Sequence, residues 1–498
     1  MKLMNIESEP TTAIANSGAG STWPGKWIFL ALAAYFALLA LLRGVSSETA
    51  GIDDVDQVLR AQIWSWGYGP QPPLYTWLTK IFLDLFGSNI FSLALLKELQ
   101  VFAIYVFVYL IAERVTHSGY CALAATALLQ FDPSIAWEAH RELTNSVLAS
   151  AFVLATIYLF LRLDSNRWRA YAAFGICCGL GLLSKWNFAI MLAALLFAAL
   201  GVAPFRSLVL NRKMVAVLLV TLALVALPAR WILQHPSLAF SSVWKLRIHD
   251  NAGWQMAVAG LEKWAVEWTA HVALLLLALF IFFGRKMLRP AAPLPESRLL
   301  WLTLGWTMIL ITVAVIAFRA EGIRDRYLQP LFVWLPVLAA TVLREHLTGK
   351  RLAAILAVST AVAGGILAAV PGRLFLTEPL HRNEVLNTPF RRFATDLAPV
   401  VRGADAIIAE NHPLAGNLRL WFPHQLVVDE EVAPLFEPPR GRVVLVWDAT
   451  ARPAPPARLL HFAHTFTGKS QLGHISRFEE RLKYCRYRTM CLAAAPWE

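Results

Sequence analysis

Long apolar stretches recur along most of this chain, and they restrict it to one class of fold. A helix needs about 20 apolar residues to cross a bilayer, and its backbone polar groups are then satisfied within the helix. Shorter stretches must borrow flanking aromatic residues or lie inside a bundle. Eleven stretches occur, at residues 27–42, 91–112, 120–136, 147–161, 171–183, 188–202, 215–233, 272–283, 299–318, 328–343 and 352–370. The sequence therefore predicts an all-α polytopic membrane protein with about eleven transmembrane helices.

Composition and charge agree with a membrane protein and argue against a nucleic-acid partner. The chain is 57% hydrophobic and only 16% charged, which is too apolar for a soluble enzyme of 498 residues. Its net charge of +12 is spread over short loops, with no basic stripe interleaved with aromatic residues. With a cytoplasmic amino terminus, the basic residues gather in the inside loops. We therefore expect a multi-pass plasma (inner) membrane protein with its chemistry on the periplasmic face, where most loop carboxylates fall.

Three segments are expected along the chain. Residues 1–22 are polar and predict a disordered cytoplasmic tail. Residues 23–371 form the transmembrane catalytic domain. The first span is expected to be a retained anchor, because Arg43 follows it directly and no small-residue cleavage site does. Residues 372–498 predict a small periplasmic α/β domain with buried strands at 406–409 and 443–447, in which Cys485 and Cys491 could pair.

Two outside loops are expected to touch the membrane surface. In the first, Val55, Leu59, Ile63 and Trp66 recur at helical spacing and would lay an apolar face on the bilayer. Residues 74–85 predict a second surface helix, which Pro72-Pro73 would separate from the first. The second outside loop, residues 234–271, carries four tryptophans. They suit either an aromatic belt or a grip on a lipid tail.

An acidic cluster in the first outside loop is the leading candidate for chemistry. Asp53 or Asp54 at a membrane surface could serve as a general base that deprotonates an attacking hydroxyl. The two side chains diverge at a helix start, so one would be the base while the other orients a partner or caps the helix. An ordinary solvated loop is the alternative interpretation.

Several polar residues on the same side could bind the other reactant. A phosphate leaving group needs fixed cations, and Lys185, Arg326 and Tyr327 are the candidates, although a cation at a helix end can also simply reach towards lipid headgroups. The polar tips of Tyr68, Gln71 and Tyr75 could contact sugar or phosphate.

Histidines and acidic residues do not show the spacing of a metal site. Glu138 and His140, two residues apart, would diverge on a helix, and solvation at the membrane edge is the favoured interpretation for their segment. The histidines of the carboxyl-terminal domain, His412 among them, are too scattered for metal ligation, and no catalytic group is evident there. No metal ligand is therefore assigned. The sequence makes no cofactor certain and leaves a divalent metal open.

Taken together, four motifs resemble the GT-C glycosyltransferases that use lipid carriers, the group of the protein O-mannosyltransferases and the lipid A aminoarabinose transferases. The resemblance covers roughly residues 27–345. Its motifs are Asp53-Asp54, the run Gln71-Pro72-Pro73-Leu74-Tyr75-Thr76-Trp77-Leu78, the run Gly179-Leu180-Gly181-Leu182-Leu183-Ser184-Lys185, and Arg326-Tyr327-Leu328-Gln329-Pro330.

The resemblance implies a GT-C fold and an inverting transfer of a sugar from a polyprenyl phosphate carrier to a glycolipid, such as lipid A or lipopolysaccharide, or to a protein. It implies Asp53 as the base, with Asp54 beside it, and contacts from Lys185, Arg326 and Tyr327 to the carrier phosphate. The chain departs from the group where many members have an acidic residue and this one has Thr144-Asn145. That departure puts the divalent metal of some members in doubt. A flippase for lipid-linked sugars and a polysaccharide ligase remain as alternatives.

Overall fold

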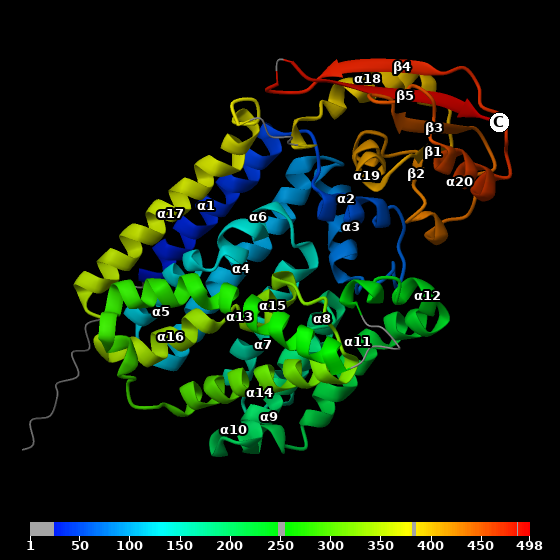
Figure 1. Ribbon diagram of the computed structural model, residues 1–498. Helices are drawn as coiled ribbons and strands as arrows, with labels where there is room; N and C mark the ends of the chain where they lie inside the picture. Colours follow the sequence, from blue (N-terminus) through cyan, green and yellow to red (C-terminus); the bar gives the residue numbers. More distant parts are fainter. Residues whose placement is uncertain (1–23, 248–253, 381–384, 486) are drawn as a thin grey trace, which may run out of the picture.

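The protein consists of a helical body with a small mixed sheet at one end (Figure 1). A computed structural model describes residues 24–247, 254–380, 385–485 and 487–498. The predicted disordered tail, residues 1–22, lies outside the described residues.

Among the described residues, seven helices are long and apolar enough to cross a bilayer. They are α1 (Pro24–Ser46), α4 (Ile90–Thr116), α7 (Thr144–Leu161), α11 (Met214–Gln234), α13 (Trp254–Phe283), α14 (Pro295–Phe318) and α17 (Gly349–Phe375). Their apolar sequences explain the helices, since a membrane span must satisfy its backbone internally. The protein is therefore a multi-pass membrane protein.

The remaining apolar stretches form bent or shorter helices. The pair α9 (Phe188–Leu200) and α10 (Ala203–Val209) is bent by 120°, and α15 (Asp325–Phe332) meets the segment that contains α16 (Leu335–Leu343) at 48°. Counting each bent pair as one span gives up to nine among the described residues. Two shorter apolar helices are α5 (Gly119–Leu128) and α8 (Trp168–Ser184). All eleven predicted stretches fall on helices, and the number that crosses a bilayer stays a prediction.

The helical body packs around one large apolar core. Helix α4 packs against α1 and α7, and α8 packs against α11 and α7. Trp334, Phe160 and Phe174 are among the largest fully buried side chains of this core. Such interdigitated packing holds the helix ends in fixed positions, which matters because the candidate site is built from those ends.

Two short helices lie at the end of the body that faces the sheet. They are α2 (Ile52–Arg60) and α3 (Leu74–Phe86), and Pro73 precedes α3 as predicted. The predicted apolar face of the first helix does not lie on the bilayer. Val55 and Leu59 are fully buried, and α19 (His412–Trp421) covers them. The helix also ends at Arg60, so Ile63 and Trp66 do not extend this face.

The contact between α2 and α19 is close because α19 has a glycine there. A Cβ atom at Gly416 would lie 2.3 Å from the Cβ atom of Val55, which is too close for two carbon atoms that are not bonded to each other. Only glycine lets the two backbones approach to this distance. The carboxyl-terminal part is thereby held directly against the helix that carries the acidic cluster.

A five-stranded sheet forms the core of the carboxyl-terminal part. Its strands are β1 (Ala406–Ala409), β2 (Leu426–Val428), β3 (Val443–Asp448), β4 (Ser476–Arg481) and β5 (Thr489–Trp497), in the order β2-β1-β3-β5-β4. Strand β1 is parallel to β2 and β3, with Ile407 opposite Val444, and β5 is antiparallel to β3 and β4. The carboxyl-terminal part also contains the helices α18 (Phe390–Val401), α19 and α20 (Ala457–Thr467).

Both strand predictions are confirmed. Short continuous apolar runs such as those of β1 and β3 are typical of strands buried on both faces. Cys485 and Cys491, which could have paired, are free thiols.

The second of the two loops predicted to lie outside the membrane is shorter than expected. Helix α13 begins at Trp254, so Trp264 and Trp268 belong to a helix and not to a loop. Trp264 is buried and stacks on Phe332, which makes it part of the core. Between α11 and residue 247 lie α12 (Pro236–Ala239) and the 3-10 turn η3 (Val243–Leu246).

Candidate active site

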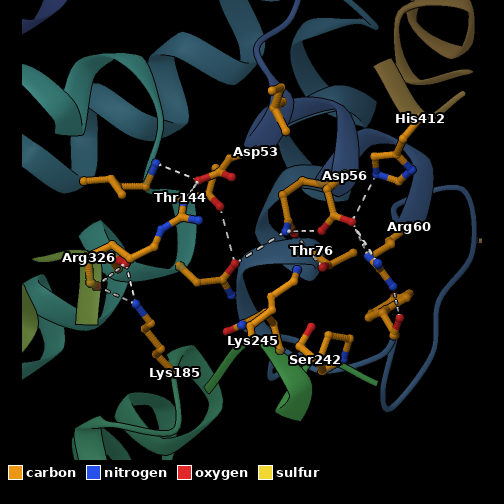
Figure 2. A pocket seen from close by; sticks show the side chains of 18 of the residues that line it. Asp53, Asp56, Arg60, Thr76, Thr144, Lys185, Ser242, Lys245, Arg326 and His412 are labelled. Atoms are coloured by element: carbon orange, nitrogen blue, oxygen red, sulfur yellow. Dashed lines mark hydrogen bonds and ion pairs between the residues drawn. The ribbon is translucent and has the colours of Figure 1, made fainter. Parts of the chain in front are cut away.

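A cavity of about 270 Å³ lies where the body meets the carboxyl-terminal part. Its wall brings together segments that are far apart in the sequence: α2, the loop before α3, the start of α7, the residue after α8, η3, the start of α15, the start of α19, and Glu431. Figure 2 shows two groups of charged side chains in it, one around Asp53 and Arg326 and one around Asp56 and His412. Both the helical body and the carboxyl-terminal part contribute charged side chains to the cavity wall.

One face of α2 supplies the acidic wall. Asp53, Asp56 and Arg60 stand at positions i, i+3 and i+7, so they share a face of the helix. Asp54 is rotated away from this face and forms an ion pair of 2.9 Å with Lys97 of α4. Carboxylates in the first turn of a helix are also favoured by its dipole. The two adjacent aspartates therefore have different surroundings, and only Asp53 lines the cavity.

The Asp53 carboxylate is fixed through one of its two oxygens. Its Oδ2 accepts hydrogen bonds from the Leu143 backbone N–H at 2.9 Å and from the Arg326 guanidinium at 2.6 Å. No described residue donates a hydrogen bond to the other oxygen, and the side chain is 21% exposed. Leu143 has a φ of +67°, an uncommon conformation for a non-glycine residue that aims its N–H at Asp53. Asp53 thus has an oriented carboxylate with a second oxygen open to the cavity.

Lys185, Arg326 and Tyr327 form a compact cationic group beside Asp53. The Lys185 ammonium donates hydrogen bonds to Ser146 Oγ at 2.5 Å and to the Arg326 carbonyl oxygen at 2.8 Å. It also lies 5.4 Å from the centre of the Tyr327 ring. Burial and the neighbouring Arg326 lower the pKa of Lys185 to about 7, and the nearby Asp53 carboxylate offsets only part of this effect. An incoming anion would relieve this cost, so the group is suited to bind a phosphate.

The position of Lys185 depends on a close approach between α8 and the start of α9. Lys185 follows the end of α8, and Phe188 begins α9 three residues later. A Cβ atom at Gly181 would lie 2.2 Å from the Phe188 ring. Glycine at this point of the Gly179–Lys185 motif therefore lets α9 fold back and leaves Lys185 at the cavity wall.

A chain of buried amides and hydroxyls joins the two charged groups. The Thr76 hydroxyl donates to Gln57 Oε1 at 2.7 Å, and Gln57 Nε2 donates to Asn145 Oδ1 at 3.4 Å. Asn145 donates in turn to the Ser184 carbonyl oxygen at 3.2 Å. The Thr144-Asn145 pair, where the chain departs from the GT-C motif, thus lies in the cavity wall as neutral polar groups.

The second charged group links α2 to the carboxyl-terminal part. His412 lies between two carboxylates: its Nε2 is 3.3 Å from Asp56 and its Nδ1 is 2.8 Å from Asp429. Asp56 also pairs with Arg60 at 2.8 Å. Burial lowers the pKa of His412, but the hydrogen bonds and charges of Asp429 and Asp56 outweigh it and raise the pKa to about 10. Burial raises the pKa of Asp56, but Arg60 and His412 outweigh it and lower the pKa to about 2.

His412, Asp429 and Glu431 also lie close enough together to hold a metal ion. A histidine ligand must be neutral and must offer a lone pair to the metal. Here both ring nitrogens face carboxylates, the raised pKa keeps the ring protonated, and Arg60 is 3.8 Å from Glu431. The donor set therefore fits an ion-pair network better than a metal site, and we derive no step through a metal.

The structure brings most of the predicted site residues to one cavity. Asp53, Lys185, Arg326, Tyr327, Tyr68 and Gln71 line it. Tyr68 is held in place because its backbone carbonyl accepts a hydrogen bond from the Arg60 guanidinium. Asp54 and Tyr75 do not line it, and Tyr75 is buried in the apolar cluster beneath α3.

Other residues of the cavity were missed by sequence analysis. Asp56 belongs to the same acidic cluster of the sequence as Asp53 and Asp54 but was assigned no role, whereas His412 and Glu431 had no local signal. His412 and Glu431 bring the carboxyl-terminal part, in which no catalytic group was evident from the sequence, into the cavity wall. His140 is not solvated at a membrane edge: it is buried and lies 2.9 Å from Glu98 of α4.

Comparison with known proteins identifies the group to which this geometry belongs. The chain is 31% identical over 435 residues to the lipopolysaccharide core galacturonosyltransferase RgtB of Rhizobium johnstonii, covering 85% of this chain and 87% of that protein. It is 30% identical over 440 residues to RgtA of the same organism, covering 84% and 86%. Residues 70–231 match the family described as dolichyl-phosphate-mannose-protein mannosyltransferase.

A solved structure shares the fold over nearly the whole chain. ArnT from Cupriavidus metallidurans, in a structure bound to undecaprenyl phosphate, aligns with a TM-score of 0.60 and 15% identity, covering 95% of this chain and 98% of ArnT. The GT-C fold predicted from the sequence is therefore confirmed. The chain is a membrane-bound glycosyltransferase that belongs to the family of the Rhizobium lipopolysaccharide core galacturonosyltransferases.

Proposed function

We propose that this protein transfers a galacturonosyl residue from a polyprenyl phosphate carrier to a sugar hydroxyl of a lipopolysaccharide core, with inversion at the anomeric carbon. The observation that carries the proposal is the cavity in which the open oxygen of Asp53 lies beside the cationic group of Lys185 and Arg326. The names of the two relatives supply the sugar and the acceptor, and the ArnT structure supplies the class of carrier.

Asp53 is the general base in this proposal. Arg326 and the Leu143 N–H hold one carboxylate oxygen, which leaves the other to accept the proton of the acceptor hydroxyl. The hydroxyl oxygen then attacks the anomeric carbon from the side opposite the carrier phosphate. A glycosidic bond forms, the bond between the sugar and the phosphate oxygen breaks, and the proton stays on Asp53. Positioned general bases contribute about 10² to 10⁴ in rate.

The cationic group stabilises the carrier phosphate as it leaves the sugar. As the bond to the sugar breaks, the carrier phosphate gains negative charge, which nearby fixed cations stabilise. Lys185 and Arg326 supply that charge, and the Tyr327 ring lies beside the Lys185 ammonium. Because these groups are already held by Ser146 and Asp53, little reorganisation is needed when the phosphate arrives.

The reaction would take place on the periplasmic face of the inner membrane. The inside loops between the spans are rich in Arg and Lys, which supports this orientation, and the carboxyl-terminal part would then also be periplasmic. A glycolipid acceptor is supported by the relatives' names over 85% of this chain, and a protein acceptor by the match of residues 70–231 to the mannosyltransferase family. The relatives are transferases, so neither a flippase nor a polysaccharide ligase is favoured.

The test compares glycolipids from a deletion strain complemented with wild type or with Asp53→Asn. We expect mass spectrometry to show that the variant loses one galacturonosyl residue from its lipopolysaccharide core while the lipid-linked donor accumulates. Asp84→Asn is the matched control, because Asp84 is an exposed carboxylate of α3 that pairs with Lys80 outside the cavity. The control should behave as wild type.

Two results would count against the proposal. Full modification of the core by folded Asp53→Asn would remove Asp53 as the base. A deletion strain with an unaltered set of glycolipids would remove the galacturonosyl assignment. Donor trapped on the cytoplasmic side would instead support the flippase alternative.

A further inference from the structure

Charge pairing in the cavity leaves two lysines without an anionic partner. The cavity is lined by three carboxylates, and each has a cation nearby. Asp53 pairs with Arg326 at 2.6 Å, and Asp56 pairs with Arg60 at 2.8 Å. Glu431 lies 3.7 Å from His412 and 3.8 Å from Arg60. Of the lysines and arginines that line the cavity, Lys185 and Lys245 pair with no carboxylate of a described residue.

These two lysines line the cavity and belong to different segments of the chain. Lys185 is buried at the end of α8 and is held by Ser146 and the Arg326 carbonyl. Lys245 belongs to η3 in the connection between α11 and α13, and it is exposed. Its ammonium lies 5.8 Å from the ring of its neighbour Trp244, and no described side chain donates or accepts a bond with it. In Figure 2, Lys245 lies between the Asp53 group and the Asp56 group.

The proposed donor has two anionic groups. The phosphodiester is attached at the anomeric carbon, and a uronic acid carries a second negative charge on its carboxylate. Both substituents are on carbons that flank the ring oxygen, so they leave the ring on either side of it. A donor with a neutral sugar has only the phosphate charge. The number of unpaired lysines in the cavity therefore matches the charge of a uronosyl phosphate.

We propose that Lys245 binds the carboxylate of a uronic acid on the donor while Lys185 binds the phosphate, which makes Lys245 the residue that selects an acidic sugar. The inference rests on the proposed function, because it assumes that the donor is a lipid-linked galacturonosyl phosphate. Arg60 and His412 are less suited to this role, since each is already engaged by Asp56. An ammonium that pairs with a carboxylate at the open side of a cavity distinguishes the charged sugar from its neutral counterpart.

The test uses the full chain in nanodiscs and two synthetic lipids: polyprenyl phosphate galacturonate and its methyl ester, which lacks the charge and is larger by one methyl group. Dissociation constants are measured directly, and transfer is measured with the acid. We expect wild type to bind the acid about tenfold more tightly than the ester, as for one hydrogen bond to a charged group. Lys245→Gln should bind the two lipids equally, and Lys245→Arg should restore the preference.

Arg247→Gln is the matched control. Arg247 is a cation of the same connection, but it pairs with Glu321 and does not line the cavity. It should keep the wild-type preference. A preference for the acid that survives in Lys245→Gln, or a wild type without any preference, overturns the role of Lys245 and leaves the proposed function standing if transfer from the acid occurs. A wild type that does not transfer from the acid overturns the proposed function itself.

Discussion

Two aspartates on the same face of α2 differ in how completely other residues pair with their carboxylates. Asp53 is held through one oxygen and keeps the other open to the cavity. Asp56 is surrounded by Arg60, His412 and Gln57, and its low pKa follows from the first two of these partners. A carboxylate with an open oxygen can take a proton, whereas a fully paired one stabilises structure. We infer that Asp53 serves chemistry and that Asp56 holds the carboxyl-terminal part against the site.

The largest effect on stability is expected from breaking the Asp56 group. Asp56→Asn leaves the protonated His412 with one carboxylate fewer. Because the Asp56 side chain is 26% exposed, the cost should lie below the about 3–5 kcal/mol expected for removing one partner of a fully buried ion pair. We expect a clear loss of thermal stability in detergent for Asp56→Asn and for His412→Gln. Asp84→Asn, which removes an exposed carboxylate, should change the melting temperature little. Equal melting temperatures for all three variants would contradict the structural role of Asp56.

The same group predicts how stability depends on pH. The pKa of His412 is raised from 6.5 to about 10, so its contribution is complete below pH 6.5 and is lost as the pH rises through 10. The pKa of Asp56 is lowered from 3.8 to about 2, so its contribution is complete above pH 3.8 and is lost as the pH falls through 2. Melting temperatures between pH 8 and 11 should therefore fall more in wild type than in His412→Gln. Parallel curves would refute the linkage.

An intermediate effect is expected at the Asp53 end from Lys185→Ala. Losing a hydrogen-bonding charge that contacts a phosphate costs about 1.5–3 kcal/mol, so kcat/KM for the donor should fall about 10- to 100-fold. Because the pKa of Lys185 is about 7, kcat/KM in wild type should also decline as the pH rises above 7 and the ammonium becomes neutral. Lys185→Arg should keep its activity at higher pH. An unchanged donor dependence in Lys185→Ala would remove Lys185 from the site.

The smallest effect is expected where the two regions touch. Gly416→Ala places a methyl group against Val55, and overpacking of this kind costs about 1–3 kcal/mol. Moving α19 away from α2 also weakens the link between His412 and Asp56. We expect reduced thermal stability and a modest loss of transfer, and Val55→Ala in the same chain should recover part of both. If the double variant is no better than Gly416→Ala, the two helices do not meet as described.

Much of the helical body could be predicted from the sequence, because membrane spans are apolar over their whole length and that signal is local. Strands β1 and β3 were also found as short apolar runs. The apolar face of α2 was misassigned, since an amphipathic helix has the same pattern whether a bilayer or another helix covers Val55 and Leu59. Only the tertiary structure shows that α19 covers it.

The sequence predicted the group of site residues around Asp53, but it did not predict the contact between Asp56 and His412. The motifs around Asp53, Lys185 and Arg326 carried the resemblance to GT-C enzymes. His412 lies more than 350 residues from Asp56, and no spacing rule connects the two. Lys245 had no motif either, because a single lysine in a loop near a membrane has no distinguishing pattern. Contacts between segments that are distant in the sequence can be recognised only once the three-dimensional fold is known.

The most direct test of the account is the rate of sugar transfer by Asp53→Asn, measured per folded molecule at saturating donor. The account predicts a loss of about 10² to 10⁴ in this rate with a melting temperature close to that of wild type. Transfer by Asp53→Asn at the wild-type rate would contradict it.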